Sequence, residues 1–234
     1  MNEAVVLTPE RILEATEDVL RRYGLTKATV VDVARALDVS HGSVYRHFPS
    51  KASLRDAVAK RWLDRANEPL CKLAAGDGPA PERLEKWLRT AFSIKQKKVC
   101  DDPEMFATYL ALAQGAREVV EAYKDKQVDL IAKILSDGVA QGVFEMDDVK
   151  TTARAVFDAT VRYHHPAHAE EWAKPECPSR IDALIALLLR GVNVGGVTVQ
   201  APRATTPASA ADGLKPGMAA FLRPASRLPV AGRA

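Results

Sequence analysis

Residues 29 to 51 read TVVDVARALDVSHGSVYRHFPSK, and this stretch decides how the rest of the chain is interpreted. One face of a first short helix is apolar, at Val30, Val33, Ala34 and Leu37. After a break at residues 38–40, a second apolar set follows, made of Val39, Val44 and Phe48. Between these anchors the second helix leaves small or polar side chains free, namely Ser40, His41, Gly42, Ser43, Tyr45, Arg46 and His47. Two short helices with such a surface on the second are typical of a helix-turn-helix that reads the DNA major groove.

Three runs of residues extend this pattern. They are RILEA at 11–15 with Tyr23-Gly24, Thr29 with Val33-Ala34, and GSVYRHF at 42–48 with Lys51 and Leu54. Together they resemble the DNA-binding end of the TetR family of bacterial transcriptional regulators, over about residues 8 to 68. The resemblance implies an all-α fold, with an N-terminal three-helix helix-turn-helix domain and a C-terminal helical bundle for ligand binding and dimerisation. The family often has Gly at the turn position occupied here by Asp38, and Asp tolerates left-handed backbone better than most residues.

Site roles follow from chemistry and from position in that motif. His41, Gly42 and Ser43 match positions that approach base edges, and Arg46 has the reach to contact a guanine. Phosphate contacts are expected from four residues, Thr29, Tyr45, His47 and Lys51, and for His47 a packing role within the motif competes. With Ser40, the predicted DNA-binding set is Thr29, Ser40, His41, Gly42, Ser43, Tyr45, Arg46, His47 and Lys51.

Helix signals organise the N-terminal part. Thr8-Pro9-Glu10 predicts a helix start, and the helix is expected to end at Gly24 with an inner face made of Ile12, Leu13, Val19, Leu20 and Tyr23. Residues 29–32 predict a capping box for the next helix. Ser50 is expected to cap a fourth helix that starts at Lys51, and Pro69 with the loop 76–81 is expected to end it. We therefore place a domain boundary near residue 66.

Beyond residue 80 only helical periods are found. Helices are predicted at about 81–99, 103–113, 118–141, 148–164 and 179–192, and no strand signal interrupts them. The expected domains are 1–65 for DNA binding, 66–192 for regulation and dimerisation, and 193–234 as a disordered basic tail rich in Pro, Ala, Ser and Thr.

One recognition helix positions too few side chains for genomic specificity, so such proteins generally bind inverted-repeat operators as two-fold dimers. The helices near 148–164 and 179–192 carry apolar surface beyond one core face, and the resemblance implies that they form the homodimer interface. The competing interpretation buries both helices within one subunit.

The resemblance also implies a small-molecule effector of unknown identity, whose binding shifts the spacing of the two DNA-binding domains. Aromatic and Met side chains of the C-terminal half are candidates to line its pocket, and each of them also fits the protein core. The candidates are Trp62, Trp87, Phe92, Met105, Phe106, Tyr109 and Tyr123.

Composition and charge distribution bear on the partners and the cellular location of the protein. The 234-residue chain has a net charge of only +3, but residues 40–61 carry five cations against Asp56 alone, which favours a phosphate-binding face; they are Arg46, Lys51, Arg55, Lys60 and Arg61. Neither a membrane span nor a signal peptide is recognisable, so we expect a cytoplasmic protein. The three cysteines are odd in number and far apart, which suits free thiols.

Two alternatives to a ligand-responsive repressor stay open. One is a DNA-binding dimer without an inducer, whose helical half serves only to dimerise. The other is a metal-binding protein that uses the cluster His164, His165, His168, Glu170 and Glu171, although Pro166 interrupts the cluster and breaks any helix that would place its histidines on one face. No nucleophile motif, phosphate loop or acid pair favours an enzyme, and we expect neither a cofactor nor a bound metal.

Overall fold

The computed structural model describes residues 6–193, and within that range the regular structure is helical. The only β feature in these residues is an isolated bridge between Phe144 and Asn193, where the loop after α7 meets the end of α11. The predicted all-α fold is confirmed. The predicted basic tail lies, from residue 194 on, outside the described residues. No helix of the described part is both long and apolar enough to span a bilayer.

The first three helices are α1 (Pro9–Lys27), α2 (Val30–Ala36) and α3 (His41–His47). The hydroxyl of Thr8 accepts from the backbone N–H of Arg11, as expected of an N-cap. Gly24 has φ of 70°, so the regular part of α1 ends there and a short further turn continues to Lys27. Tyr23 does not belong to the inner face as predicted: it is 44% exposed, because the buried face is filled by other residues, among them Ile12, Ala15, Val19 and Leu20.

Two local predictions around the turn are confirmed. Asp38 adopts φ of 55° and so supplies the left-handed residue between α2 and α3. Thr29 forms a capping box with Asp32, in which each side chain accepts the other residue's backbone N–H, at 3.1 and 3.2 Å. These contacts fix where α2 begins and how sharply the chain turns into α3.

Helix α4 (Lys51–Ala75) begins as predicted, with a capping box between Ser50 and Ser53. The expectation that Pro69 ends it is wrong, because α4 continues through Pro69 for six further residues. A proline inside a helix loses one backbone hydrogen bond and crowds the preceding turn. Here α4 packs against both α5 and α7, and Leu70 and Ala74 are fully buried beyond the proline, so tertiary packing outweighs that cost. The boundary placed near residue 66 falls inside this continuous helix.

The C-terminal half contains α5 (Ala80–Asp101), α6 (Pro103–Gly115), α7 (Arg117–Ala140), α8 (Val149–Ala159), α9 (Val161–His164), α10 (Ala169–Trp172) and α11 (Cys177–Val192). The single helix predicted at 148–164 is divided at Thr160, whose hydroxyl contacts the carbonyl oxygens of Val156 and Phe157. The chain between α9 and α10 forms one 3-10 turn, Pro166–His168.

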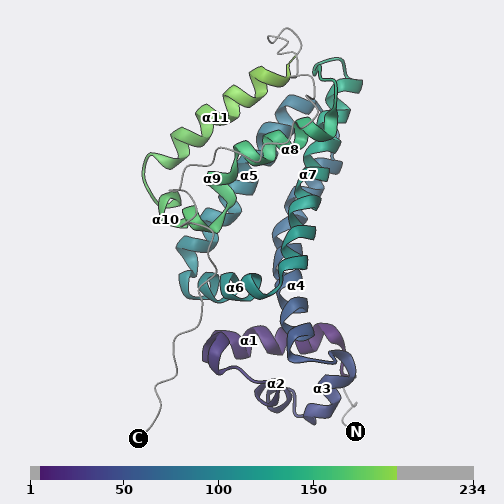
Figure 1. Cartoon of the computed structure of the whole chain (residues 1–234), viewed down its shortest axis with the longest axis vertical. Coiled ribbons are helices and arrows are strands. Elements are labelled where there is room, and N and C mark those ends of the chain that lie inside the picture. The colour runs from purple at the N-terminus through teal and green to yellow at the C-terminus, as the bar shows by residue number, and fades with distance from the viewer. Residues whose placement is uncertain (1–5, 194–234) are drawn as a thin grey trace, which may run out of the picture. The chain divides into compact units, whose positions relative to one another are not determined.

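Two apolar clusters make up the core. One joins α4, α5, α7, α8, α9, α10 and α11. The other fills the space inside α1–α4 and also takes in one side of α6, through Met105, Tyr109 and Leu112, together with Ala116 just after the end of α6. Figure 1 shows α6 lying between α1 and the helices of the C-terminal half, in agreement with its contacts to α1, α4, α5 and α7. Helix α6 is therefore shared between the two predicted domains.

Candidate functional site

One side of helix α3 packs against the protein core, and the other side faces solvent. Val44 is fully buried against the core of α1–α4, while Ser43 is half-buried. The remaining residues of the helix are exposed, namely His41, Gly42, Tyr45, Arg46 and His47. The rings of His41 and Tyr45 meet edge to face with centroids 6.3 Å apart. The fold thus brings the predicted base-reading residues onto one solvent-facing surface, as an entry into a DNA groove requires.

A polar network organises the start of this helix. The hydroxyl of Ser40 accepts from the backbone N–H of Ser43 at 3.1 Å, and the two hydroxyls are 2.9 Å apart. The guanidinium of Arg46 donates to the Ser43 hydroxyl at 2.9 Å. A side chain at Gly42 would meet only the Ser40 hydroxyl, at 3.7 Å, so the fold itself does not demand glycine there. Arg46 is therefore pre-positioned over the first turn of α3, beside the backbone that Gly42 leaves uncovered.

Thr29 and Lys51 lie at the N-termini of α2 and α4. Lys51 is exposed and has no carboxylate partner among the described residues, so its ammonium is available to an anion. The hydroxyl of Thr29 donates to the Asp32 carboxylate at 2.6 Å, so its proton is already used within the capping box. The same hydrogen bond is the main cause that lowers the pKa of Asp32.

The charge count of residues 40–61 overstated the surface available to phosphate. Arg61 forms ion pairs with Glu14 and Glu17 of α1, at 2.8 and 3.4 Å. Lys60 pairs with Asp64 one turn along α4, and Arg55 donates to the carbonyl oxygen of Leu25. Arg55 and Arg61 thus join α4 to α1, which linear sequence does not show, while Lys60 stays exposed in a pair within α4. Arg46 and Lys51 are the two of the five cations that keep no such partner.

A second site lies inside the C-terminal half. A cavity of about 20 Å³ is surrounded by residues of α5, α7, α8, α9 and α11 and by Thr160. Its lining is Trp87, Leu88, Ala91, Phe92, Gln127, Phe157, Thr160, Tyr163, His164 and Ile181. Of the seven predicted pocket residues only Trp87 and Phe92 belong to it. Gln127, Tyr163 and His164 were missed because they come from helices whose packing on α5 is a tertiary fact.

The other five predicted pocket residues lie elsewhere. Trp62 stacks on Tyr109 with ring centroids 4.6 Å apart, and Phe106 approaches the same indole at 6.4 Å. Burial raises the pKa of the Tyr109 hydroxyl to about 12. Met105 is buried in the cluster shared with α1–α4, and Tyr123 accepts a hydrogen bond from Lys95 at 3.2 Å.

Buried polar groups border the cavity. The indole N–H of Trp87 is buried and has no hydrogen-bond partner among the described residues. Gln127 donates to the carboxamide oxygen of Asn67, and the Asn67 N–H group is likewise buried without a partner. Buried polar groups are nearly always satisfied by protein, water or ligand. Because Trp87 also lines the cavity, the cavity wall contains an unsatisfied hydrogen-bond donor.

The histidines of residues 164–168 do not converge. His164 Nε2 donates to the Phe157 carbonyl at 3.0 Å, while His165 accepts from the backbone N–H of Ala167. His168 contacts Glu171 at 3.4 Å, and Glu171 is paired with Arg162. Within residues 6–193 no three His, Cys, Asp or Glu side chains are grouped so as to hold a metal ion.

His164 should make stability depend on pH. Burial lowers its pKa to about 4, and the hydrogen bond to the Phe157 carbonyl only partly opposes this. Between pH 6.5 and 4 the unfolded chain then binds a proton that the folded chain does not, so stability falls as the pH is lowered through this window. We expect His164 to account for a loss of up to about 3 kcal/mol. Urea unfolding of the parent and of His164→Asn at several pH values measures it; equal slopes in the two proteins would contradict the assignment.

Comparison with known families covers most of the described chain. The family model described as "Bacterial regulatory proteins, tetR family" matches residues 12–58, and the model described as "Tetracyclin repressor-like, C-terminal domain" matches residues 80–185. A curated relative, the HTH-type transcriptional repressor KstR2 of Mycolicibacterium smegmatis, is 26% identical over 174 residues. That alignment covers 67% of this chain and 79% of the relative.

Solved structures share the fold. A TetR-family transcriptional regulator from Mesorhizobium loti superposes with a TM-score of 0.61 at 15% identity, covering 80% of this chain and 96% of the other. The fatty acid degradation regulator FadR from Bacillus halodurans gives 0.52 at 18% identity, covering 79% and 100%. At these identities the likeness concerns the fold alone.

Proposed function

Since this chain belongs to the TetR family of bacterial DNA-binding transcriptional regulators, we propose that it is a repressor that binds an inverted-repeat operator as a homodimer. A small molecule bound in the C-terminal half releases the DNA. The KstR2 relative is named as a repressor, and this supports repression rather than activation of transcription. In this proposal the protein acts in the cytoplasm and catalyses no reaction.

The observation that carries the proposal is the surface of α3. A buried Val44 anchors the helix, and four side chains capable of hydrogen bonding are exposed on it, with Gly42 between them. Ser43 and Arg46, already joined at 2.9 Å, read base edges in the major groove. Tyr45, His47 and Lys51 bind phosphate and fix the orientation of α3 on the duplex. The hydroxyl of Thr29 reaches phosphate only by exchanging its contact with Asp32.

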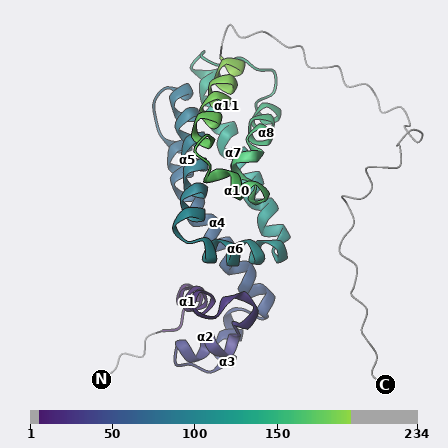
Figure 2. The same cartoon turned by 90° about the vertical axis from the view of Figure 1, so that its left-hand side faces the viewer.

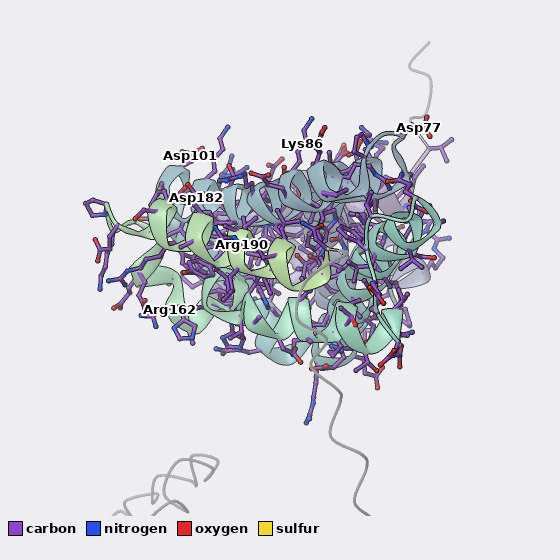
Figure 3. All side chains as sticks on the ribbon, turned by 90° about the horizontal axis from the view of Figure 1, so that it is seen from above. Asp77, Lys86, Asp101, Arg162, Asp182 and Arg190 are labelled. Atoms are coloured by element: carbon purple, nitrogen blue, oxygen red, sulfur yellow. The ribbon has the colours of Figure 1, made fainter. Side chains whose placement is uncertain are left out.

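The dimer interface is assigned to α8 and α11. Helix α11 packs on α5, and its other side is open: Leu187 is 65% exposed, and Ala183 and Ala186 beside it are also exposed. Figure 2 shows α11 at the front with α8 beside it. In Figure 3 Asp182 lies at the edge of α11 next to α5, where it pairs with Arg89, while the helix faces the viewer. Apolar residues on an uncovered helix face suit a two-fold four-helix interface.

Replacing Leu187 by Asp should therefore separate the subunits. In the proposed interface the new aspartate of each subunit is buried, and burying an unpaired charge is costly. Two-fold symmetry also places the two aspartates near one another, so they repel. Because Leu187 is largely exposed in the single chain, the monomer fold should be kept, with an unchanged circular dichroism spectrum. Light scattering after size exclusion measures the mass. Val31→Asp is the matched control, since Val31 is an exposed valine on α2 and should leave the dimer intact. A dimeric Leu187→Asp protein would refute this interface.

Selection from a random DNA library by the purified full chain, at about physiological salt, tests the function as a whole. An inverted repeat among the bound sequences is the expected result, because two α3 helices of a two-fold dimer face successive major grooves. Folded protein that selects no sequence would refute the proposal.

A further inference from the structure

Two lysines on α5 have no acidic partner. The ammonium of Lys95 contacts the Tyr123 hydroxyl at 3.2 Å and lies 5.2 Å from the centre of that ring. The ammonium of Lys98 lies 4.3 Å from the centre of the Trp62 ring. Both side chains are partly buried, and neither forms an ion pair with a carboxylate in the described part of the chain. Buried cations are normally paired with an anion.

The electrostatic surroundings of Lys98 are unfavourable to its charge. Burial is the main cause that lowers its pKa to about 8, and the positive charges of Lys95 and Arg65 lower it further. Glu17 is the acidic group that acts in the opposite direction. An anion bound beside the ammonium would remove this cost, because an opposite charge within a few ångströms favours the charged form.

The lysines continue the wall of the cavity. Ala91, Lys95 and Lys98 are spaced four and three residues apart, so they lie on one face of α5. Ala91 lines the cavity, and the helix rises by about 6 Å from Ala91 to Lys95 and by about 10 Å to Lys98. The charge of Lys95 also lowers the pKa of His164, which lines the cavity from the opposite wall. An apolar chamber and a cationic end thus adjoin along one helix.

We propose that this site takes an amphipathic organic anion, whose apolar body enters the cavity between Trp87 and Phe157 and whose anionic head group binds Lys95 and Lys98. The inference rests on the proposed regulatory function in taking the site as that of the effector. An oxygen acceptor on the ligand body satisfies the indole N–H of Trp87. The negative charge of the ligand lies at the lysine end alone, because the residues that line the cavity, His164 included, are uncharged at neutral pH.

Entry of such a ligand requires the cavity to widen, since about 20 Å³ holds roughly one water molecule. The wall opposite α5 comes from Phe157, Tyr163 and His164, on either side of the break between α8 and α9 at Thr160. This wall is built from short helices, and α9 has only four residues. Widening is therefore expected there, while α5 stays in place.

A pair of dyes that differ in charge tests the proposal without DNA. The anionic 8-anilinonaphthalene-1-sulfonate and the uncharged N-phenyl-1-naphthylamine share one apolar body, and both become fluorescent in apolar surroundings. The full chain is expected to bind the sulfonate at one site per subunit and about tenfold more tightly than the uncharged dye. Excitation of tryptophan should sensitise the bound dye, since Trp62 and Trp87 lie at the two ends of the site.

Variants assign the effect to the lysines. Lys95→Gln with Lys98→Gln should weaken sulfonate binding about tenfold and leave the uncharged dye unchanged. Lys97→Gln, an exposed lysine on the same helix, should change neither. Ala91→Phe, which fills the cavity, should weaken both dyes. Undiminished sulfonate binding by the double variant, equal binding of the two dyes by the parent, or binding of neither would overturn the proposal.

The two proposals fail separately. If the lysines select the sulfonate while the DNA library yields no repeat, the anion site stands and the regulatory role falls. If an inverted repeat is recovered while the dyes bind without regard to charge, the regulatory role stands and the anion site falls.

Discussion

Replacing Arg46 by Ala is expected to lower affinity for the selected operator by about a hundredfold, and affinity for random DNA far less. A good arginine contact to a guanine contributes about 1–3 kcal/mol of discrimination against the wrong base. A two-fold dimer carries two copies of Arg46, so the loss is counted twice, and about 3 kcal/mol in total corresponds to about a hundredfold. The contact of Arg46 with Ser43 holds the guanidinium over the start of α3, where base edges would lie.

Lys51→Ala provides the contrast, because a phosphate contact carries no sequence information. It should weaken operator and random DNA alike, and reduce the slope of log affinity against log salt by about one per subunit. Lys60→Ala is the control, since Lys60 is exposed on the same helix but paired with Asp64. Fluorescence anisotropy titrations at several salt concentrations measure all three. If Arg46→Ala weakened every sequence equally, the base-reading role of Arg46 would be wrong.

Gly138→Ala is expected to destabilise the fold by about 3 kcal/mol, lowering the melting temperature by roughly 10 °C. Gly138 lies in α7, and a Cβ atom there would come within 2.0 Å of the Phe144 ring. Phe144 is only 3% exposed, and its backbone N–H donates to the Gly138 carbonyl at 3.2 Å, so the ring has nowhere to move. Elsewhere in a helix the same change would stabilise by up to about 1 kcal/mol, because Ala is the better helix former.

Gly115→Ala is the matched control, as Gly115 is helical and a Cβ atom there meets nothing within 4 Å. It should leave stability unchanged or raise it slightly. Thermal and urea unfolding of both variants measure the difference. A Gly138→Ala protein as stable as Gly115→Ala would mean that the loop holding Phe144 can move away, and that the packing of α7 against this loop is loose.

The family comparison and the fold agree with those predictions that depend on residues close together in the sequence. The left-handed turn at Asp38, the capping boxes at Thr29 and Ser50, and the exposed face of α3 each depend on residues within about one helical turn of one another. Periodicity also located the long helices of the C-terminal half to within a few residues. Such features can be predicted from sequence because the hydrogen bonds and apolar stripes that produce them span three or four residues.

Other features were decided by contacts between distant segments. The continuation of α4 through Pro69 depends on packing against α5 and α7, and the loss of Arg61 from the phosphate face depends on Glu14 and Glu17, more than forty residues earlier. The cavity likewise draws its wall from five helices, and the unpaired state of Lys95 and Lys98 depends on which residues the surrounding helices bring near them. Sequence by itself determined the recognition element and the helical class, since both arise from short-range bonding. Only the tertiary structure decided which charges are paired and which apolar faces meet, because packing brings together residues that sequence spacing does not relate.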